Sequence, residues 1–257
     1  MSADWNGKKV IVTGGGGGMG QAAAVRFAEA GARVFVLGRT VESLEASVAL
    51  SEAITAVVCD VADPESVGAA MGEIGTPDLL VHTAGINTPD RSMAHADASK
   101  VASLESWKRV LDINVLGVVN MMQAVAGPMA ASGGGKIVVV SSTAGHGFDS
   151  YAGVPYTASK WAVHGLLMTA RAQLSAQGIV VSEYAPGEAN TPIVDKRPVL
   201  PTEVHREAMI QTGDCAEALY FIASQAHSVS MIQLPKYQPF GGMPPEISAP
   251  WLAGIFE

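Results

Sequence analysis

Cysteine, charge and long apolar runs are all scarce in this chain of 257 residues. The two cysteines, Cys59 and Cys215, form no metal-binding spacing, and so sparse a use of cysteine predicts a reducing compartment, the cytoplasm. No apolar run approaches the ~18 residues of a membrane span. The first residues also lack the apolar core of a signal peptide. We therefore expect no membrane partner.

Charged residues make up 16% of the chain, the net charge is −8, and no cluster of Lys and Arg exceeds a pair. A nucleic acid is therefore not an expected partner. The six histidines show no ligand motif, so the sequence predicts no metal site. The hydrophobic fraction of 48% and the many Gly and Ala residues favour one closely packed domain over residues 1–257.

Short β-branched runs alternate with longer helical patterns, which is typical of βαβ units. We expect strands at Lys9–Thr13, Arg33–Leu37, Ala56–Cys59, Asp78–His82, Lys136–Ser141, Gly178–Tyr184 and Ser230–Leu234. Helices are expected from Met19 to a left-handed cap at Gly31, from about Ser106, and from near Tyr156 to Gly178. The predicted fold class is α/β, a Rossmann-type doubly wound parallel sheet of about seven strands with helices on both faces.

Two stretches fall outside this alternation. Residues Asn87–Ser106 are polar and small, and they are longer than a usual connection. Residues 235–257 are rich in proline and carry scattered apolar side chains, so an extended tail is expected. So apolar a tail should pack on the rim of a pocket or on a neighbouring subunit, unless it is a frayed end.

A glycine run, Thr13–Gly20, directly follows the first predicted strand and precedes an Ala-rich helix. Glycines allow a tight turn in which backbone amides approach a pyrophosphate, and the helix N-terminus adds a positive dipole end. A run of glycines could be a linker, but its place between a strand and a helix favours a dinucleotide site.

The residues after the next two strands bear on which nicotinamide cofactor is used. After the second strand there is no carboxylate to bind a ribose 2′-hydroxyl, and Arg39 suits a 2′-phosphate. A solvated surface arginine is the alternative, so NADP(H) is favoured and NAD(H) stays possible. Asp60 could accept a hydrogen bond from an adenine amino group, or it could cap a turn.

Five motifs stand in the order found in one known family: Thr13–Gly20 as TGxxxGxG, Asn114–Gly117, Ser141-Ser142, Tyr156–Lys160 as YxxxK, and Pro186-Gly187 with Thr191-Pro192. Over residues 5 to 234 the chain resembles the short-chain dehydrogenase/reductase family. The resemblance implies catalytic roles for Asn114, Ser142, Tyr156 and Lys160. It implies cofactor contacts from Gly14, Gly17, Gly18, Met19, Gly20, Arg39, Asp60, Val61, Ala84, Gly85, Tyr156, Lys160, Pro186, Gly187 and Thr191.

The chemistry of these side chains supports the implied roles. Lys160 lies four residues after Tyr156, so both emerge on one helical face, and a nearby ammonium favours the phenolate of tyrosine. Tyr156 could then pass a proton to or from a substrate oxygen. Asn114 lies on an apolar stripe, where a buried amide must be hydrogen-bonded. The resemblance places it in a proton relay that reaches Lys160; the alternative is a satisfied core asparagine.

The chain departs from the family's pattern at several points. Ser142 is one residue farther from Tyr156 than the family's spacing, which leaves Thr143 as a second candidate for the hydroxyl that faces the substrate oxygen. His82 stands where the family usually has an asparagine, and we expect a structural role for it. The glycine-rich ending after the last strand is also missing.

The substrate pocket is expected to be lined from loops beyond the strand ends by His146, Phe148, Ser150, Tyr151, Glu188, Ile193 and Val194. Glu188 would disfavour an anionic substrate unless it points to solvent. We expect an oxidoreductase that interconverts a small-molecule alcohol and carbonyl, in a homodimer or homotetramer as the resemblance implies. Two alternatives are a non-catalytic NAD(P)-binding regulatory protein, which should lack Tyr156 or Lys160, and a sugar-nucleotide epimerase or dehydratase, which needs a longer C-terminal part.

Overall fold

Seven parallel strands form a sheet at the centre of the protein in the computed structural model, which describes residues 4–147, 151–197 and 199–234. The strands lie in the order β3-β2-β1-β4-β5-β6-β7. Their bounds are β1 Lys9–Thr13, β2 Arg33–Gly38, β3 Ile54–Val58, β4 Leu79–His82, β5 Gly135–Val140, β6 Ile179–Pro186 and β7 Ser230–Gln233.

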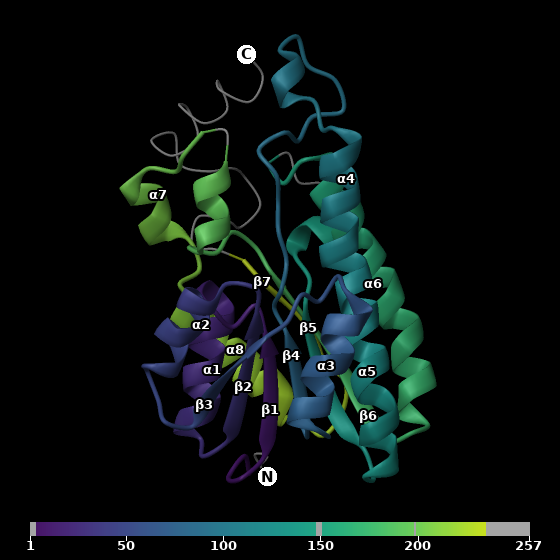
Figure 1. The fold of residues 1–257 in the computed structure, drawn as a ribbon. Helices are drawn as coiled ribbons and strands as arrows, with labels where there is room; N and C mark the ends of the chain where they lie inside the picture. Colours follow the sequence, from purple (N-terminus) through teal and green to yellow (C-terminus); the bar gives the residue numbers. More distant parts are fainter. Residues whose placement is uncertain (1–3, 148–150, 198, 235–257) are drawn as a thin grey trace.

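Helices cover both faces of this sheet (Figure 1). On one face lie α1 Gly18–Glu29, α2 Val41–Val48 and α8 Thr212–Ser224. On the other lie α3 Pro64–Ile74, α4 Leu104–Leu111, α5 Gly117–Ala131 and α6 Val154–Ser175, while the short α7 Glu203–Ala208 lies beyond the carboxyl ends of the strands. This is the Rossmann-type doubly wound fold that the sequence predicts.

Every predicted strand is present, with ends that differ by at most two residues. β3 begins at Ile54 and ends at Val58, so Cys59 already belongs to the turn, and β6 continues through Pro186. The expected cap of the first helix is confirmed, since Gly31 has a φ of 84°. Phe148, Ser150 and the tail from 235 to 257 lie outside the described residues.

The sheet reverses its direction of growth between β1 and β4, which are hydrogen-bonded neighbours. From β1 the chain builds outward through β2 to β3, then crosses back to β4 and builds the other half. Ligands of doubly wound folds bind in the crevice at the carboxyl ends of the strands beside such a reversal. The glycine loop and the residues after β4 both lie there.

A long apolar helical stretch, Leu104–Ala131, is interrupted by a π-helical turn at Asp112–Leu116. Within the described residues, this stretch is long and apolar enough to span a membrane. The sequence alone predicts no such span. Its buried side chains, among them Val118 and Met121, pack in the core between the sheet and the neighbouring helices, which accounts for its composition.

Candidate active site

The glycine loop between β1 and α1 leaves almost no room for side chains. Gly14 has a φ of 66°, and a Cβ there would lie 3.0 Å from the backbone of Ala84. A Cβ on Gly20 would collide with the carbonyl oxygen of Gly14. Both positions therefore require glycine, one for its backbone conformation and both for close packing.

The start of α1 faces open space. Gly17 precedes the helix in an extended conformation without a side-chain cap, and a Cβ on it would meet no described atom within 4 Å. The N–H groups of the first helical turn thus point to a region that a pyrophosphate can occupy. The next residue, Gly18, has a φ of 53° and packs against Thr191, which brings the glycine loop to the segment after β6. These residues fit a dinucleotide cofactor.

A cavity beside the loop collects side chains from the ends of β1 to β4. Among the described residues that line it are the predicted cofactor residues Gly14, Arg39, Asp60, Val61, Ala84 and Gly85. Arg39 Nη1 lies 3.6 Å from Asp60 Oδ2, and both side chains are partly exposed. Asp60 Oδ1 also accepts a hydrogen bond from the backbone N–H of Ala62 at 3.0 Å, so the aspartate caps this turn as well.

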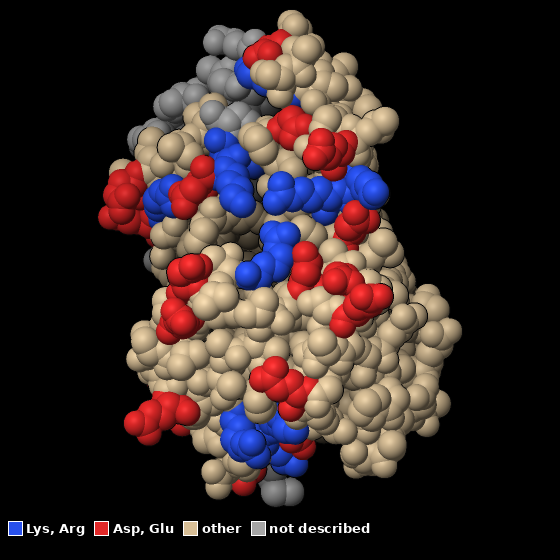
Figure 2. Space-filling model, viewed as in Figure 1, with Lys and Arg blue, Asp and Glu red and all other residues tan. Residues whose placement is uncertain are grey.

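Charged side chains of both signs surround this region. Figure 2 shows Lys and Arg interspersed with Asp and Glu on the face seen in Figure 1. Several Lys and Arg side chains lie close together across the middle of this face, beside a hollow, with Asp and Glu around them.

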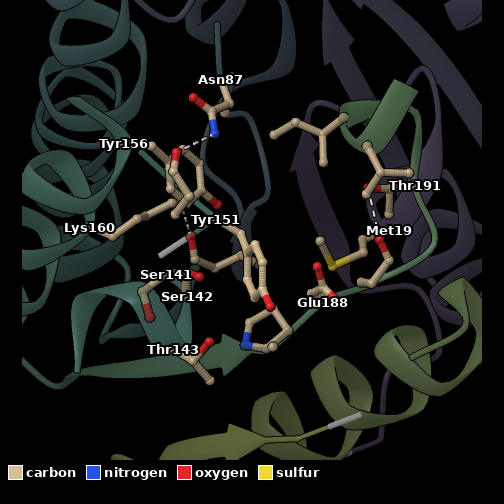
Figure 3. A pocket seen from close by; sticks show the side chains of 18 of the residues that line it. Met19, Asn87, Ser141, Ser142, Thr143, Tyr151, Tyr156, Lys160, Glu188 and Thr191 are labelled. Atoms are coloured by element: carbon tan, nitrogen blue, oxygen red, sulfur yellow. Dashed lines mark hydrogen bonds between the residues drawn. The ribbon is translucent and has the colours of Figure 1, made fainter. Parts of the chain in front are cut away.

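Tyr156 and Lys160 project from the first turns of α6 into a second cavity (Figure 3). Lys160 Nζ lies 5.4 Å from the centre of the Tyr156 ring. The same ammonium donates a hydrogen bond to the carbonyl oxygen of Val140, 3.0 Å away at the end of β5. Burial lowers the pKa of Lys160 to about 8, and the carboxylate of Glu183 opposes that shift.

Asn114 lies in the π-helical turn, and its buried amide is fully engaged. Its Oδ1 accepts from the backbone N–H of Ile86 at 2.8 Å, and its Nδ2 donates to the Ile86 carbonyl at 2.9 Å. Nδ2 also donates to Ser159 Oγ at 3.1 Å, whose hydroxyl in turn donates to the Tyr156 carbonyl at 2.7 Å. The amide therefore ties the segment after β4 to the helix that carries Tyr156 and Lys160.

Ser141, Ser142 and Thr143 line the same cavity as Tyr156. Ser142 precedes a short 3₁₀ turn, Thr143–Gly145, and its Oγ accepts a hydrogen bond from the N–H of Ala144 at 3.2 Å. The hydroxyl oxygen accepts this bond through a lone pair, so the hydroxyl proton remains able to donate to another acceptor. Ser141 Oγ donates to the Tyr184 carbonyl at 3.4 Å, as expected for a structural serine.

Across this cavity from Tyr156 and the serines lie Met19, Glu188 and Thr191 (Figure 3). The predicted residues Tyr151, Pro186, Gly187, Ile193 and Val194 also line it, and so do Ala152 and Arg197. His146 is not among the described lining residues, because its ring bonds to Glu183 instead.

Glu188 faces the cavity rather than open solvent, and two partners hold its carboxylate. Arg197 Nη1 lies 2.7 Å from one oxygen, and His205 Nε2 lies 2.8 Å from the other. The repulsion of anions expected from an isolated Glu188 is therefore offset by a neighbouring cation.

Arg91 also lines the cavity, a position that sequence reasoning missed. Its buried guanidinium donates to the carbonyl oxygens of Thr88 at 2.6 Å, Tyr151 at 3.2 Å and Lys196 at 3.2 Å. In the sequence, Arg91 is one charge in a polar connection, and no local pattern distinguishes it from a solvated side chain.

Comparison with known proteins identifies the family of this chain. The family model described as short chain dehydrogenase matches residues 8–199, which is more than half of the chain. This chain belongs to the short-chain dehydrogenase family. Cis-4-hydroxycyclohexanecarboxylate dehydrogenase from Sinomonas cyclohexanicum is 34% identical over 231 residues, which cover 85% of this chain and 90% of that protein.

Solved structures agree on the fold of this short-chain dehydrogenase. A structure titled as a short-chain type dehydrogenase/reductase from Mycobacterium ulcerans has a TM-score of 0.76 and 22% identity, covering 91% of this chain and 94% of that one. A structure titled ribose-5-phosphate isomerase from Brucella melitensis 16M has a TM-score of 0.78 and 27% identity, covering 90% and 93%. The protein is an oxidoreductase that acts on CH–OH groups, and its family implies use of NAD(P).

His82 is the clearest departure of this short-chain dehydrogenase from its family's usual motif. The ring is buried at the end of β4, and neither nitrogen has a hydrogen-bond partner among the described residues. Burial, together with the charge of Lys160, lowers the pKa of His82 to about 3. The ring is therefore neutral in the folded protein, and the hydrogen bonds expected of a structural histidine are not seen within the described part of the chain.

Proposed function

We propose that this enzyme transfers a hydride between NADP(H) and an alcohol/carbonyl pair, with Tyr156 as the general acid and base. One observation carries the proposal: Tyr156, Lys160 and Ser142, from two different elements, line a single cavity. This cavity borders Gly187 and Thr191 in the segment after β6, and it reaches Met19 in the first turn of α1.

The nicotinamide, when bound, accepts or supplies the hydride. In our account Ser142 donates a hydrogen bond to the substrate oxygen and orients it toward Tyr156. Tyr156 then gives a proton to that oxygen during reduction or removes it during oxidation. The ammonium of Lys160 favours the phenolate, and its bond to Val140 holds that charge near the reacting oxygen.

Asn114 stabilises the arrangement of this site through its hydrogen bonds. Its amide joins Ile86 to Ser159, three residues after Tyr156 on α6. π-helical turns are frequent at functional sites, because the extra residue in the turn redirects side chains and backbone groups. We assign Asn114 to positioning α6 and to the proton path toward Lys160.

The preference for NADP(H) rests on Arg39. Its side chain lines the nucleotide cavity next to Thr40 and Ser43, and the described lining after β2 contains no carboxylate. Asp60 faces Arg39 at 3.6 Å, a distance that leaves the guanidinium able to turn toward a 2′-phosphate. NAD(H) would bind without that contact.

The presence of both Tyr156 and Lys160 in the cavity favours an enzyme over a non-catalytic nucleotide sensor. The decisive experiment mixes the full chain with NADPH or NADP⁺ and a panel of carbonyls or alcohols, and follows nicotinamide absorbance. The panel includes 4-hydroxycyclohexanecarboxylate, because the relative named for it is similar over most of both chains. No turnover with any member, under conditions where the cofactor binds, would contradict the proposal.

We further propose a homodimer or homotetramer in the cytoplasm. Trp161 and Met168 are seven residues apart on α6, hence on one face, and they are 49% and 60% exposed. Leu116, between α4 and α5, is 50% exposed as well. Such large apolar side chains on long helices are typical of a surface that a second copy covers.

The two cysteines bear on the proposed compartment. Both are buried and form no disulfide, as in a reducing compartment.

A further inference from the structure

Three potential metal ligands meet outside the reaction cavity, from segments far apart in the sequence. His146 follows the 3₁₀ turn after Ser142, His164 lies in the middle of α6, and Glu183 lies on β6. Their ligand atoms all lie within 4.8 Å of one another. The spacing of these residues along the chain matches no metal motif, which is why the sequence alone predicts no such site.

The ligand atoms converge closely on the buried carboxylate. His146 Nε2 lies 2.9 Å from Glu183 Oε1, and His164 Nδ1 lies 3.2 Å from Oε1 and 3.0 Å from Oε2. The two imidazole rings are tilted by 59° with centres 4.1 Å apart, so they approach Glu183 from different directions. A tetrahedral zinc with bonds of about 2.0–2.1 Å separates its ligands by roughly 3.3–3.4 Å. The distances from the two histidine nitrogens to the carboxylate are therefore a few tenths of an ångström shorter than in such a site.

We propose that His146, His164 and Glu183 form a binding site for a divalent transition metal, with Zn²⁺ as the best match. Two imidazoles and one carboxylate are a common zinc ligand set, whereas Mg²⁺ and Ca²⁺ require mostly oxygen ligands. The side chains of His146 and His164 are 17% and 23% exposed, which gives the ion a path from solvent and a water as fourth ligand.

The surroundings of Glu183 favour the charged form of its carboxyl group. Burial raises the pKa of the Glu183 carboxyl, but hydrogen bonds, those of His164 and His146 among them, outweigh this effect and hold that pKa below its usual value.

Arg171 would compete with a metal ion for the carboxylate of Glu183. Its Nη2 lies 3.4 Å from Glu183 Oε2, longer than a good charge-assisted hydrogen bond. Its Nε is buried and has no hydrogen-bond partner among the described residues. The side chain is 23% exposed and can swing toward solvent when a metal takes its place. Metal binding therefore has to displace one cation.

A bound zinc would tie together three segments of the enzyme: the turn after Ser142, the helix that carries Tyr156 and Lys160, and the strand that leads to Pro186 and Gly187. This metal site lies outside the reaction cavity, so the main effect of the ion is on the stability of the folded state. A ligand that binds only the folded state raises the melting temperature in proportion to its affinity and concentration.

The test is isothermal titration of the metal-free full chain with ZnCl₂, and separately with MgCl₂, combined with thermal unfolding. We expect about one zinc per chain, a higher Tm with zinc, and neither effect with magnesium. His164→Asn should weaken zinc binding at least tenfold, and so should Glu183→Gln if it folds. Arg171→Gln should bind zinc more tightly than the wild type, because the competing charge is gone. His227→Ala, at an exposed histidine, is the matched control and should bind zinc like the wild type.

The proposal is overturned if neither the wild type nor Arg171→Gln binds zinc. It is overturned as well if His164→Asn binds zinc as tightly as the His227→Ala control, since the ion would then lie elsewhere. Because these readouts are binding and Tm rather than turnover, they do not depend on the proposed reaction.

Discussion

Lys160 donates a hydrogen bond from its ammonium to the carbonyl oxygen of Val140, 3.0 Å away, and so joins the catalytic helix to the last residue of β5. The two serines of the cavity follow directly on β5. A buried charge thus holds the proposed proton donor and the proposed substrate anchor in one arrangement. Holding that charge in the core lowers the free energy of unfolding.

Lys160→Met should abolish turnover and yet raise the free energy of unfolding at pH 7. The folded state lowers the pKa of Lys160 from 10.5 to about 8, so the charged form is disfavoured there. This shift corresponds to roughly 3 kcal/mol. The unfolded chain binds the extra proton between pH 8 and 10.5, so this group makes stability rise with pH across that window. Urea unfolding at pH 7 and pH 10 should show the rise in the wild type and a smaller one in Lys160→Met. A variant less stable than the wild type at pH 7 would contradict the prediction.

His82→Asn should make the protein less sensitive to acid. Burial lowers the pKa of His82 to about 3, so the folded ring stays neutral while the unfolded one binds a proton below about 6.5. Stability is therefore lost as pH falls from 6.5 toward 3, at about 1.4 kcal/mol per pH unit. Between pH 7 and 5 the wild type should lose about 2 kcal/mol more than His82→Asn. Urea unfolding at both values measures this, and His227→Asn should behave as the wild type. Equal losses in all three proteins would rule out this account of His82.

Arg39→Ala should weaken NADPH binding by about tenfold or more and leave NADH binding nearly unchanged, because only NADPH carries the 2′-phosphate. Fluorescence titration of both cofactors against both proteins gives the comparison. Leu50→Ala, in the turn after α2 and outside the described cavity lining, serves as control. Equal losses for both cofactors, or a wild type that prefers NADH, would refute the assignment of Arg39.

Trp161→Glu should reduce the mass measured by light scattering, since a charge on the exposed face of α6 would oppose a covered apolar interface. Leu50→Glu changes a side chain of similar exposure, 55%, away from that face and should leave the mass unchanged. If both variants keep the wild-type mass, the face of α6 is not the interface.

The sequence predicts the fold well because its signals are local. Most of the buried strands are short runs rich in β-branched residues, and Gly31 marks a helix end through its own backbone conformation. The same holds for the glycine loop and for the pair Tyr156 and Lys160, whose spacing places both on one helical face. Topology then brings Tyr156 and Lys160 to the same cavity as Met19 of the glycine loop.

Other parts of the site depend on contacts that no local pattern encodes. The π-helical turn at Asn114 interrupts a stretch that reads as one continuous helix. The ring of His146 turns to Glu183, a residue that looks like any strand position in the sequence. Glu188 alone predicts repulsion of anions, but Arg197 and His205 arrive from later segments to pair with it. Such pairings are decided by tertiary packing.

The central claim is that Tyr156 passes the proton while the cofactor handles the hydride. The most direct measurement compares wild type and Tyr156→Phe in nicotinamide absorbance assays with a substrate identified from the panel, alongside cofactor titration. The phenylalanine variant should bind cofactor with nearly unchanged affinity while its kcat falls by about 10²–10⁴, the usual contribution of a positioned acid or base. Turnover close to that of the wild type would contradict the account.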